Sequence, residues 1–170
     1  MKTGLLIVAV VLAGCAGSSR TQDRVPLTRA ELLVEANAVD SVLTQLHDAA
    51  SKADFDRYFD LYADDAIFLG TDATERWTKD QFIAYAKPHF DRGRGWTYTE
   101  KSRHVFVDRD GRTAWFDETL DNAGLGDTRG SGALVKRDGS WKIVQYNLTI
   151  PVPNDLASEV VRMIRAMDNQ

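Results

Sequence analysis

The stretch GSGALVKRDGSWKIVQYNLT, residues 130–149, contains two strand patterns joined by Asp138-Gly139, a dipeptide typical of tight hairpin turns. The same alternation of side chains marks two earlier runs, so we expect four successive strands: 96–108, 112–122, 128–137 and 141–149. Strands that follow one another through hairpins form an antiparallel sheet. The second half of the chain therefore forms a sheet.

Helical patterns precede these strands. Thr28 and Glu31 form a capping box that opens an amphipathic helix, and Thr78 and Gln81 form a second one. A short helix and then a short buried strand at 66–70 lie between them, and another amphipathic helix follows the last strand. Helices followed by a run of antiparallel strands indicate an α+β fold rather than an α/β fold.

The composition is that of an ordinary globular protein. The chain has 170 residues, 44% of them hydrophobic, with a formal net charge of −4 and a pI near 5.4. This balance argues against nucleic-acid binding and gives no support to an electrostatic membrane patch. We expect no metal site, because His47, His89 and His104 lie on separate elements without metal-ligand spacing. No cofactor is expected, since Gly124 and Gly126 sit in a loop rather than in a phosphate cradle.

The first fifteen residues, MKTGLLIVAVVLAGC, resemble the signal sequence of a bacterial lipoprotein. Lys2 is followed by an apolar run too short to span a bilayer, and Leu12-Ala13-Gly14-Cys15 matches a lipobox. The resemblance implies cleavage before Cys15, a diacylglyceryl group on its thiol, and an acyl chain such as palmitate on its amine. An ordinary secretory signal with a chance cysteine is the alternative.

The lipoprotein resemblance also implies a location. Ala16 stands where an aspartate would imply retention at the inner membrane, so we expect anchoring in the cell envelope, at the outer membrane of a bacterium with two membranes. The residues that follow are small and polar, as in a flexible linker. The expected organisation is a signal peptide at 1–14, a lipidated cysteine and linker at 15–27, a folded domain at 28–154 and a C-terminal amphipathic helix at 155–170.

Three stretches carry a resemblance to a known family: DRYFDLYADDAIFLGTDATERW (56–77), GRTAWFDETL (111–120) and GSGALVKRDGSWKIVQYNLTIPVPN (130–154). From about Glu31 to Asn154 the chain is similar to the SnoaL-like branch of the nuclear transport factor 2-like superfamily. The resemblance implies a cone, in which a strongly curved antiparallel sheet wraps around the N-terminal helices and leaves a pocket at its open end. It also implies a homodimer through the convex sheet face. It does not imply one function, because such cones include isomerases, dehydratases, hydrolases and binding modules.

The last strand of this cone, 141–149, has faces of mixed character. Trp141 and Ile143 begin one face, but polar residues continue it: Gln145, Asn147 and Thr149. The resemblance implies that this face is core at the closed end and pocket rim at the open end. We therefore expect the three polar residues in the pocket, with apolar walls from Tyr62, Trp77 and Phe116. The opposite face is then expected in the dimer interface, through Val144, Tyr146 and Leu148.

The register of this hairpin leaves two alternatives. With Asp138-Gly139 as a two-residue turn, Gly132 lies opposite Gln145 and Gly130 lies opposite Asn147. A three-residue turn would instead bring Ser131 and Arg129 onto that face. Both registers leave a polar and roomy place beside the amides.

Glu118 is the main catalytic candidate. It shares a strand face with Ala114, Phe116 and Leu120, and a carboxylate on an apolar face has a raised pKa unless it is paired, which suits a general acid or base. The alternative is a twisted or edge strand on which Glu118 is solvated. His104 is a second candidate base, although a strand histidine with satisfied hydrogen bonds is the more common case.

Two further acids, Asp72 and Glu75, follow a strand end near the expected opening of the cone. Turn chemistry is the preferred interpretation here, with Asp72 capping the turn and Glu75 on the surface.

These observations predict a lipid-anchored, homodimeric cone domain that binds a small, largely apolar molecule, oriented by Gln145, Asn147 and Glu118. The first alternative is an enzyme of isomerase, dehydratase or hydrolase type with Glu118 or His104 as its base. The second is a protein-interaction module whose cavity is filled by side chains.

Overall fold

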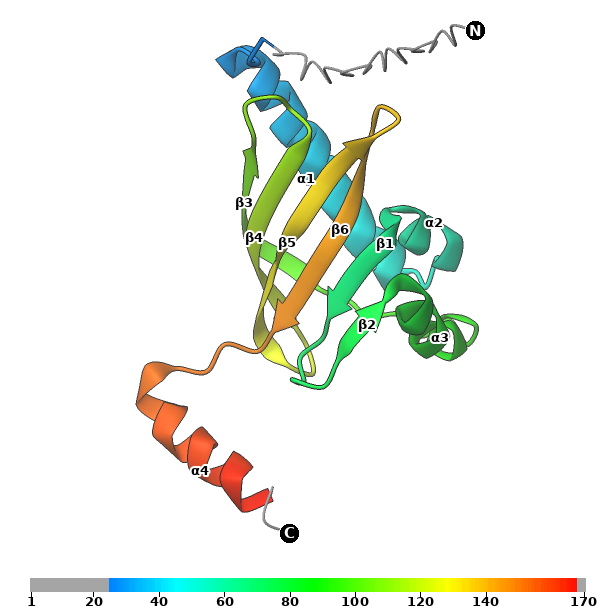
Figure 1. Cartoon of the computed structure of the whole chain (residues 1–170). Coiled ribbons are helices and arrows are strands. Elements are labelled where there is room, and N and C mark those ends of the chain that lie inside the picture. Colours follow the sequence, from blue (N-terminus) through cyan, green and yellow to red (C-terminus); the bar gives the residue numbers. More distant parts are fainter. Residues whose placement is uncertain (1–24, 168–170) are drawn as a thin grey trace, which may run out of the picture.

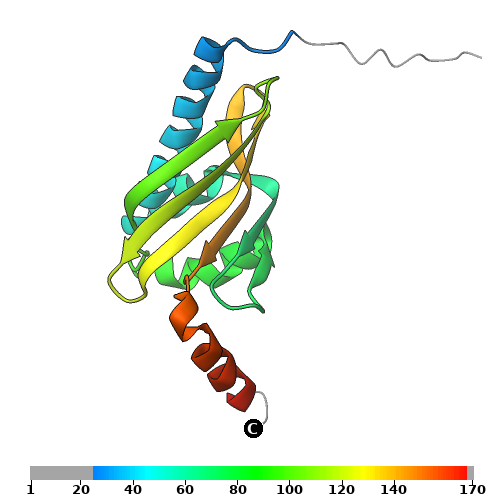
Figure 2. The same ribbon diagram turned by 90° about the vertical axis from the view of Figure 1, so that its left-hand side faces the viewer.

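A computed structural model of the chain describes residues 25–167, and Cys15 and the signal-like segment lie outside this range. A six-stranded sheet of order β2-β1-β6-β5-β4-β3 curls around the helices of the N-terminal half (Figures 1 and 2). The helical elements are α1 (Arg29–Ser51), α2 (Phe55–Asp60), α3 (Lys79–Phe90), the 3-10 turn η1 (Asn154–Leu156) and α4 (Ala157–Met167). The strands are β1 (Tyr62–Leu69), β2 (Arg76–Thr78), β3 (Thr99–Val107), β4 (Thr113–Asn122), β5 (Gly126–Arg137) and β6 (Ser140–Thr149).

The predicted α+β fold with a curved sheet around N-terminal helices is confirmed. All neighbouring strands pair antiparallel except β1 and β6, which run parallel. Both predicted capping boxes form, at Thr28 with Glu31 and at Thr78 with Gln81. The short strand β2 was not expected from the sequence, because three residues are too few to show a period.

The core lies between the concave face of the sheet and the helices. The buried stripe of α1 contributes Val39, Leu43, Leu46, Ala49 and Ala50. Aromatic rings from α2, α3 and β1 pack next to it, among them Tyr58, Phe59, Tyr62, Phe82 and Phe90. Burial of the apolar surface of these side chains is the main contribution to the stability of the domain.

A β-bulge in β6 explains why the apolar face of this strand changes side. Arg137 pairs with Ser140, so the turn has two residues, and Leu134 pairs with Ile143. The next pair is Ala133 with Gln145, which leaves Val144 as the extra residue. A bulge of one residue reverses the alternation beyond it, because side chains point to opposite faces with a period of two.

The expected division of β6 into core and pocket rim on one face is therefore wrong. Trp141 and Ile143 face the concave side before the bulge, and Tyr146 and Leu148 face it afterwards; all four are buried. The amides Gln145 and Asn147 lie on the other, convex face. They stand next to Ala133 and Ser131 of β5, which is the pairing that the sequence assigned to a longer turn.

Helix α4 projects away from the rest of the protein, at the end of the sheet opposite the start of α1 (Figures 1 and 2). None of its residues is buried. Large apolar side chains along η1 and α4 are exposed: Leu156, Val161, Met163, Ile164 and Met167. Within residues 25–167, no helix combines the length and apolar character needed to cross a membrane.

Candidate functional site

A cavity of about 200 Å³ lies between the concave face of the sheet and the helices. Aromatic side chains form most of its wall: Tyr58, Phe68, Trp77, Phe82, Tyr85, Trp96, Tyr98 and Tyr146. Thr71 and Leu125, from the loops that follow β1 and β4, line it and are exposed. These two loops therefore mark its mouth.

One wall of the cavity is a stack of nearly parallel rings. The ring of Phe68 lies 3.9 Å from that of Phe82, at an interplanar angle of 15°. The rings of Trp77 and Tyr146 lie 6.1 and 6.0 Å from Phe68, at angles of 11° and 5°. Phe68 and Trp77 face each other across β1 and β2, so the short strand β2 completes this wall. Such a wall suits a flat or apolar ligand.

His47 brings a titratable group to the cavity. It sits on α1, one residue after the buried Leu46, and lines the cavity with 12% of its side chain exposed. Its Nε2 lies 2.9 Å from Oε1 of Glu118, whose side chain is 0% exposed. Nδ1 has no hydrogen-bond partner among the described residues, which leaves it available to a molecule in the cavity.

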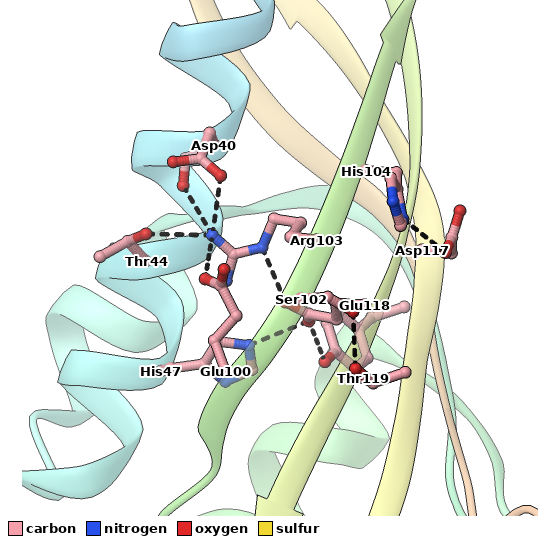
Figure 3. A network of polar contacts seen from close by, with 11 residues as sticks. Asp40, Thr44, His47, Glu100, Ser102, Arg103, His104, Asp117, Glu118 and Thr119 are labelled. Carbon is pink, nitrogen blue, oxygen red and sulfur yellow. Dashed lines mark hydrogen bonds and ion pairs between the residues drawn. The ribbon is translucent and has the colours of Figure 1, made fainter.

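Glu118 lies behind the cavity wall and receives three hydrogen bonds. Nε of Arg103 donates to Oε2 at 2.8 Å, and Nε2 of His47 lies 2.9 Å from Oε1 (Figure 3). The Tyr146 hydroxyl donates to Oε1 at 2.7 Å. Burial raises the pKa of Glu118, but the contacts with His47, Arg103 and Tyr146 outweigh burial and hold it below the ordinary value. Glu118 is therefore an ionised acceptor.

The ionisation of Glu118 fixes the direction of the hydrogen bonds that it receives. A carboxylate can only accept, so Nε2 of His47 donates, and in the neutral ring Nδ1 holds the lone pair. Burial, together with the charge of Glu118, raises the pKa of Tyr146 well above its ordinary value, so this hydroxyl stays protonated.

Arg103 connects this cluster to α1. Its Nη1 lies 3.0 Å from Oδ1 of Asp40, 3.0 Å from the Thr44 hydroxyl and 3.0 Å from Oε2 of Glu100 (Figure 3). Its Nη2 is the one buried side-chain polar atom without a hydrogen-bond partner in the described part of the chain. The guanidinium thus spans the gap between helix and sheet next to Glu118.

Gly130 makes room for the cluster. A Cβ at this position would lie 2.4 Å from the Tyr146 hydroxyl and 2.7 Å from Oε1 of Glu118. The roomy place predicted beside the amides of Gln145 and Asn147 is not found: Gly130 pairs with Leu148, and the Tyr146 hydroxyl and the Glu118 carboxylate fill the space that its missing side chain leaves.

The predicted site residues fall into three groups. Trp77 lines the cavity, whereas Tyr62 and Phe116 are buried in the core and are not among the lining residues. Gln145, Asn147 and Thr149 do not line the cavity, because the bulge turns them to the convex face.

The surroundings of the candidate acids and bases also differ from the predictions. Glu118 is buried rather than solvated, and it is paired, so the raised pKa expected for an unpaired carboxylate is not found. His104 is exposed and lies 3.3 Å from Asp117; Figure 3 shows both on the side of the sheet away from α1, so His104 is not a cavity base. Glu75, expected on the surface, lines the cavity.

Sequence reasoning missed His47 and Tyr146. His47 continues the apolar stripe of α1 after Leu43 and Leu46, and Arg103 shares a face of β3 with Val105. A histidine and the lone acid Glu118, each on an otherwise apolar face, and a cation next to apolar residues of β3 form a set that could have been matched. Tyr146 was missed because the bulge in β6 reverses the alternation of side chains and places Tyr146 on the concave face.

A family model of the SnoaL-like domain matches residues 39–153. A search of curated proteins finds no match. Within residues 25–167, no group of three or more histidine, cysteine or acidic side chains is arranged to hold a metal ion.

Solved structures with the same fold include an NTF2-like protein of unknown function from Pseudomonas putida, with a TM-score of 0.61 and 12% identity over 72% of this chain and 91% of that one. A protein named as a dehydratase of the NTF2-like family from Streptomyces avermitilis has a TM-score of 0.61 and 14% identity, over 71% and 98% of the two chains. A protein named as a scytalone dehydratase from Novosphingobium aromaticivorans has a TM-score of 0.58 and 16% identity, over 71% and 86%. At these identities the likeness shows the fold alone.

Proposed function

We propose a function from the premise that this chain belongs to the SnoaL-like domain family: its cone binds a small, largely apolar molecule, and His47 transfers a proton on that molecule. The observation that supports this proposal is the position of His47, which lines an aromatic cavity and is held from behind by Glu118. A histidine in this arrangement is suited to general acid–base catalysis.

The chemistry follows from the hydrogen bonds. Nδ1 of neutral His47 removes a proton from a ligand carbon or hydroxyl in the cavity, and Glu118 stabilises the imidazolium that results. The wall supplies a donor in Tyr58, since burial raises its pKa to about 12 and keeps its hydroxyl protonated. Proton removal with a nearby donor is the chemistry of isomerisation and of water elimination. Two of the structural neighbours carry a dehydratase name, which agrees with this reaction class.

Binding without chemistry is the second candidate, and the composition of the cavity favours it. Eight of the fifteen lining residues are aromatic. A wall of this kind holds a ligand whether or not a reaction follows. The open cavity gives less support to a protein-interaction module, which was expected to fill it with side chains.

Deuterium exchange separates the two candidates. Purified protein in D₂O is mixed with a panel of single-ring ketones, enones and hydroxyketones, and mass spectrometry follows deuterium uptake. We expect uptake by at least one compound with the wild-type protein and at least about a hundredfold less with His47→Asn. A compound that quenches cavity tryptophan fluorescence but exchanges equally with both proteins would establish binding alone.

The location of the protein is part of the proposal. The lipobox pattern at Leu12-Ala13-Gly14-Cys15 supports a lipid anchor in the cell envelope, followed by a linker to the domain. The N-terminus of α1 and the mouth of the cavity lie at opposite ends of the domain (Figure 1). A tether at α1 would therefore leave the cavity open to its ligand.

A homodimer through the convex face of the sheet is also proposed. Trp115 and Phe106 lie on this face, are about half exposed, and stack at 5.7 Å with an interplanar angle of 11°. Exposed aromatic pairs are common in interface centres. Sedimentation of the wild-type protein and of Trp115→Lys tests the dimer, which the lysine would dissociate.

A further inference from the structure

We infer that the cavity recognises an organic cation, a small ring or alkyl group that carries an ammonium charge. This inference rests on the proposed function, because it concerns the ligand of the same cavity. The charges on and behind the cavity wall, the aromatic rings and the cavity size each support it.

The charge of the wall is the first observation. Apart from His47, Glu75 is the one residue with a charged side chain among the described residues that line the cavity. No lysine or arginine lines it. A ligand in this cavity therefore meets a negative charge without a compensating positive one in the wall.

Contacts within the loop between β1 and β2 hold Glu75 in position. Gly70 donates its backbone N–H to the Glu75 carbonyl at 2.9 Å, which continues the pairing of the two strands. A Cβ on Gly70 would lie 2.1 Å from Oε2 of Glu75, so the carboxylate occupies the space that glycine leaves open. The backbone N–H of Asp72 donates to the same oxygen at 3.2 Å. Oε1 of Glu75 has no partner among the described residues and is available to a ligand.

Aromatic faces next to this carboxylate are the second observation. Trp77 follows Glu75 by two residues and lines the same cavity, and Tyr85 stacks on it with 4.6 Å between ring centroids. The faces of tryptophan and tyrosine rings carry negative electrostatic potential, and quaternary ammonium groups bind between them in other proteins. Glu75 and these rings form the two components of such a cage.

The cluster behind the cavity adds negative potential. Arg103 is surrounded by three carboxylates, those of Glu118, Asp40 and Glu100. One positive charge and three negative charges leave a net charge of −2 at this end. The net charge of this cluster therefore adds to the charge of Glu75 in favouring a cationic ligand.

The size of the cavity limits the ligand. Cavities of roughly 150 Å³ accept one benzene molecule in other proteins. At about 200 Å³, this cavity accommodates one ring with a small substituent, and a polycyclic molecule of steroid size would extend beyond its mouth. A phenyl or choline-sized ammonium compound fits this limit.

The test compares two molecules of the same shape, 3-hydroxyphenyl-trimethylammonium and 3-tert-butylphenol, which differ in charge. Binding to the full-length protein is measured by calorimetry and by quenching of Trp77 and Trp96, which both line the cavity. We expect the cation to bind about tenfold more tightly than its neutral analogue, although the neutral analogue is more hydrophobic.

Three variants assign the preference to Glu75. Glu75→Gln keeps the shape and an acceptor for Asp72, and Gly70→Ala displaces the carboxylate; both should bring the ratio of the two affinities close to one. Asp56→Asn is the matched control, because it removes one negative charge from an exposed position on α2 that does not line the cavity. It should leave the ratio unchanged.

The outcomes separate this inference from the proposed function. Equal or tighter binding of 3-tert-butylphenol to the wild-type protein overturns the inference and leaves an apolar binding cavity intact. Failure of a folded protein to bind the cation overturns the inference, whereas deuterium exchange tests the proposed function separately. The inference is also overturned if the ratio of the two affinities falls as far in Asp56→Asn as in Glu75→Gln. The preference for the cation would then reflect the overall charge of the protein.

Discussion

Arg103 donates from Nε to Oε2 of Glu118 at 2.8 Å across two neighbouring strands, and the two side chains are 2% and 0% exposed. A charge pair buried to this extent contributes little when intact but is costly to break, since the remaining charge has no access to water. This pair therefore links the stability of the fold to the geometry of the cavity.

Replacing Glu118 with glutamine should destabilise the protein by about 3 kcal/mol at pH 7, because Arg103 would keep a buried charge without its closest partner. The pKa of Glu118 is lowered in the folded protein, so its contribution is present above about pH 4.5 and is lost as the pH falls through the folded value. Urea unfolding at several pH values measures this. A gap between wild type and variant that stays constant into acid would show that ionisation of Glu118 is not its source.

Replacing His47 with alanine should abolish proton transfer while costing only about 1–2 kcal/mol, since Glu118 keeps its contacts with Arg103 and Tyr146. The hole left by the ring should admit imidazole. We expect added imidazole to restore part of the deuterium exchange in His47→Ala and none in a double variant that also carries Glu118→Gln. Full activity of His47→Ala without imidazole would contradict the assigned role.

Gly132 lies beside the bulge of β6, and a Cβ there would be 2.1 Å from the backbone oxygen of Gln145. Gly132→Ala should therefore destabilise the protein by roughly 2–3 kcal/mol, because backbone must move to relieve the contact. Gly124→Ala is the control: its nearest neighbour is 3.5 Å away, and the change should be within about 0.5 kcal/mol. Thermal unfolding of the two variants makes the comparison, and equal melting temperatures would contradict the crowding at Gly132.

Removal of residues 157–170 should leave the melting temperature of the domain within about 2 °C of wild type, because none of the residues of α4 is buried. The same truncation should lower the tendency of the protein to bind apolar surfaces, since α4 exposes Met163, Ile164 and Met167. Scanning calorimetry and binding to a hydrophobic resin measure the two effects. A clear loss of stability would show that α4 packs on the domain in solution.

Replacing Cys15 with serine should release the protein from membranes, because the lipobox then offers no thiol for the lipid. Fractionation of cells that express each form measures this. Continued membrane association of the serine variant, with an uncut signal peptide excluded by mass spectrometry, would contradict the predicted anchor.

The sequence was sufficient for the fold because each element carries its own local signal. The capping residues Thr28 and Thr78 mark helix starts, and Asp138-Gly139 marks the hairpin. The special character of Glu118 was also visible, since it is one acid on an apolar strand face.

The lining of the cavity was less predictable, for two physical reasons. The partners of Glu118 are distant in sequence, with His47 lying 71 residues away, and no local pattern reports such a contact. The bulge at Val144 is the second reason, because the alternation read from Trp141 onward assigns every later side chain of β6 to the wrong face. Through this one error Gln145 and Asn147 were assigned to the pocket, and Tyr146 and Leu148 were assigned to the dimer interface, although both are buried on the concave face.

The extra residue in β6 also bears on how cones of this kind diverge. Loss of Val144 would restore simple alternation and leave every other side chain on its present face, with Gln145 and Asn147 convex and Tyr146 and Leu148 concave. One codon lost at this position would thus remove the bulge and keep the aromatic wall without a single substitution. In an alignment with a relative that lacks the bulge, placing no gap at Val144 will therefore pair residues of opposite faces from this position onward.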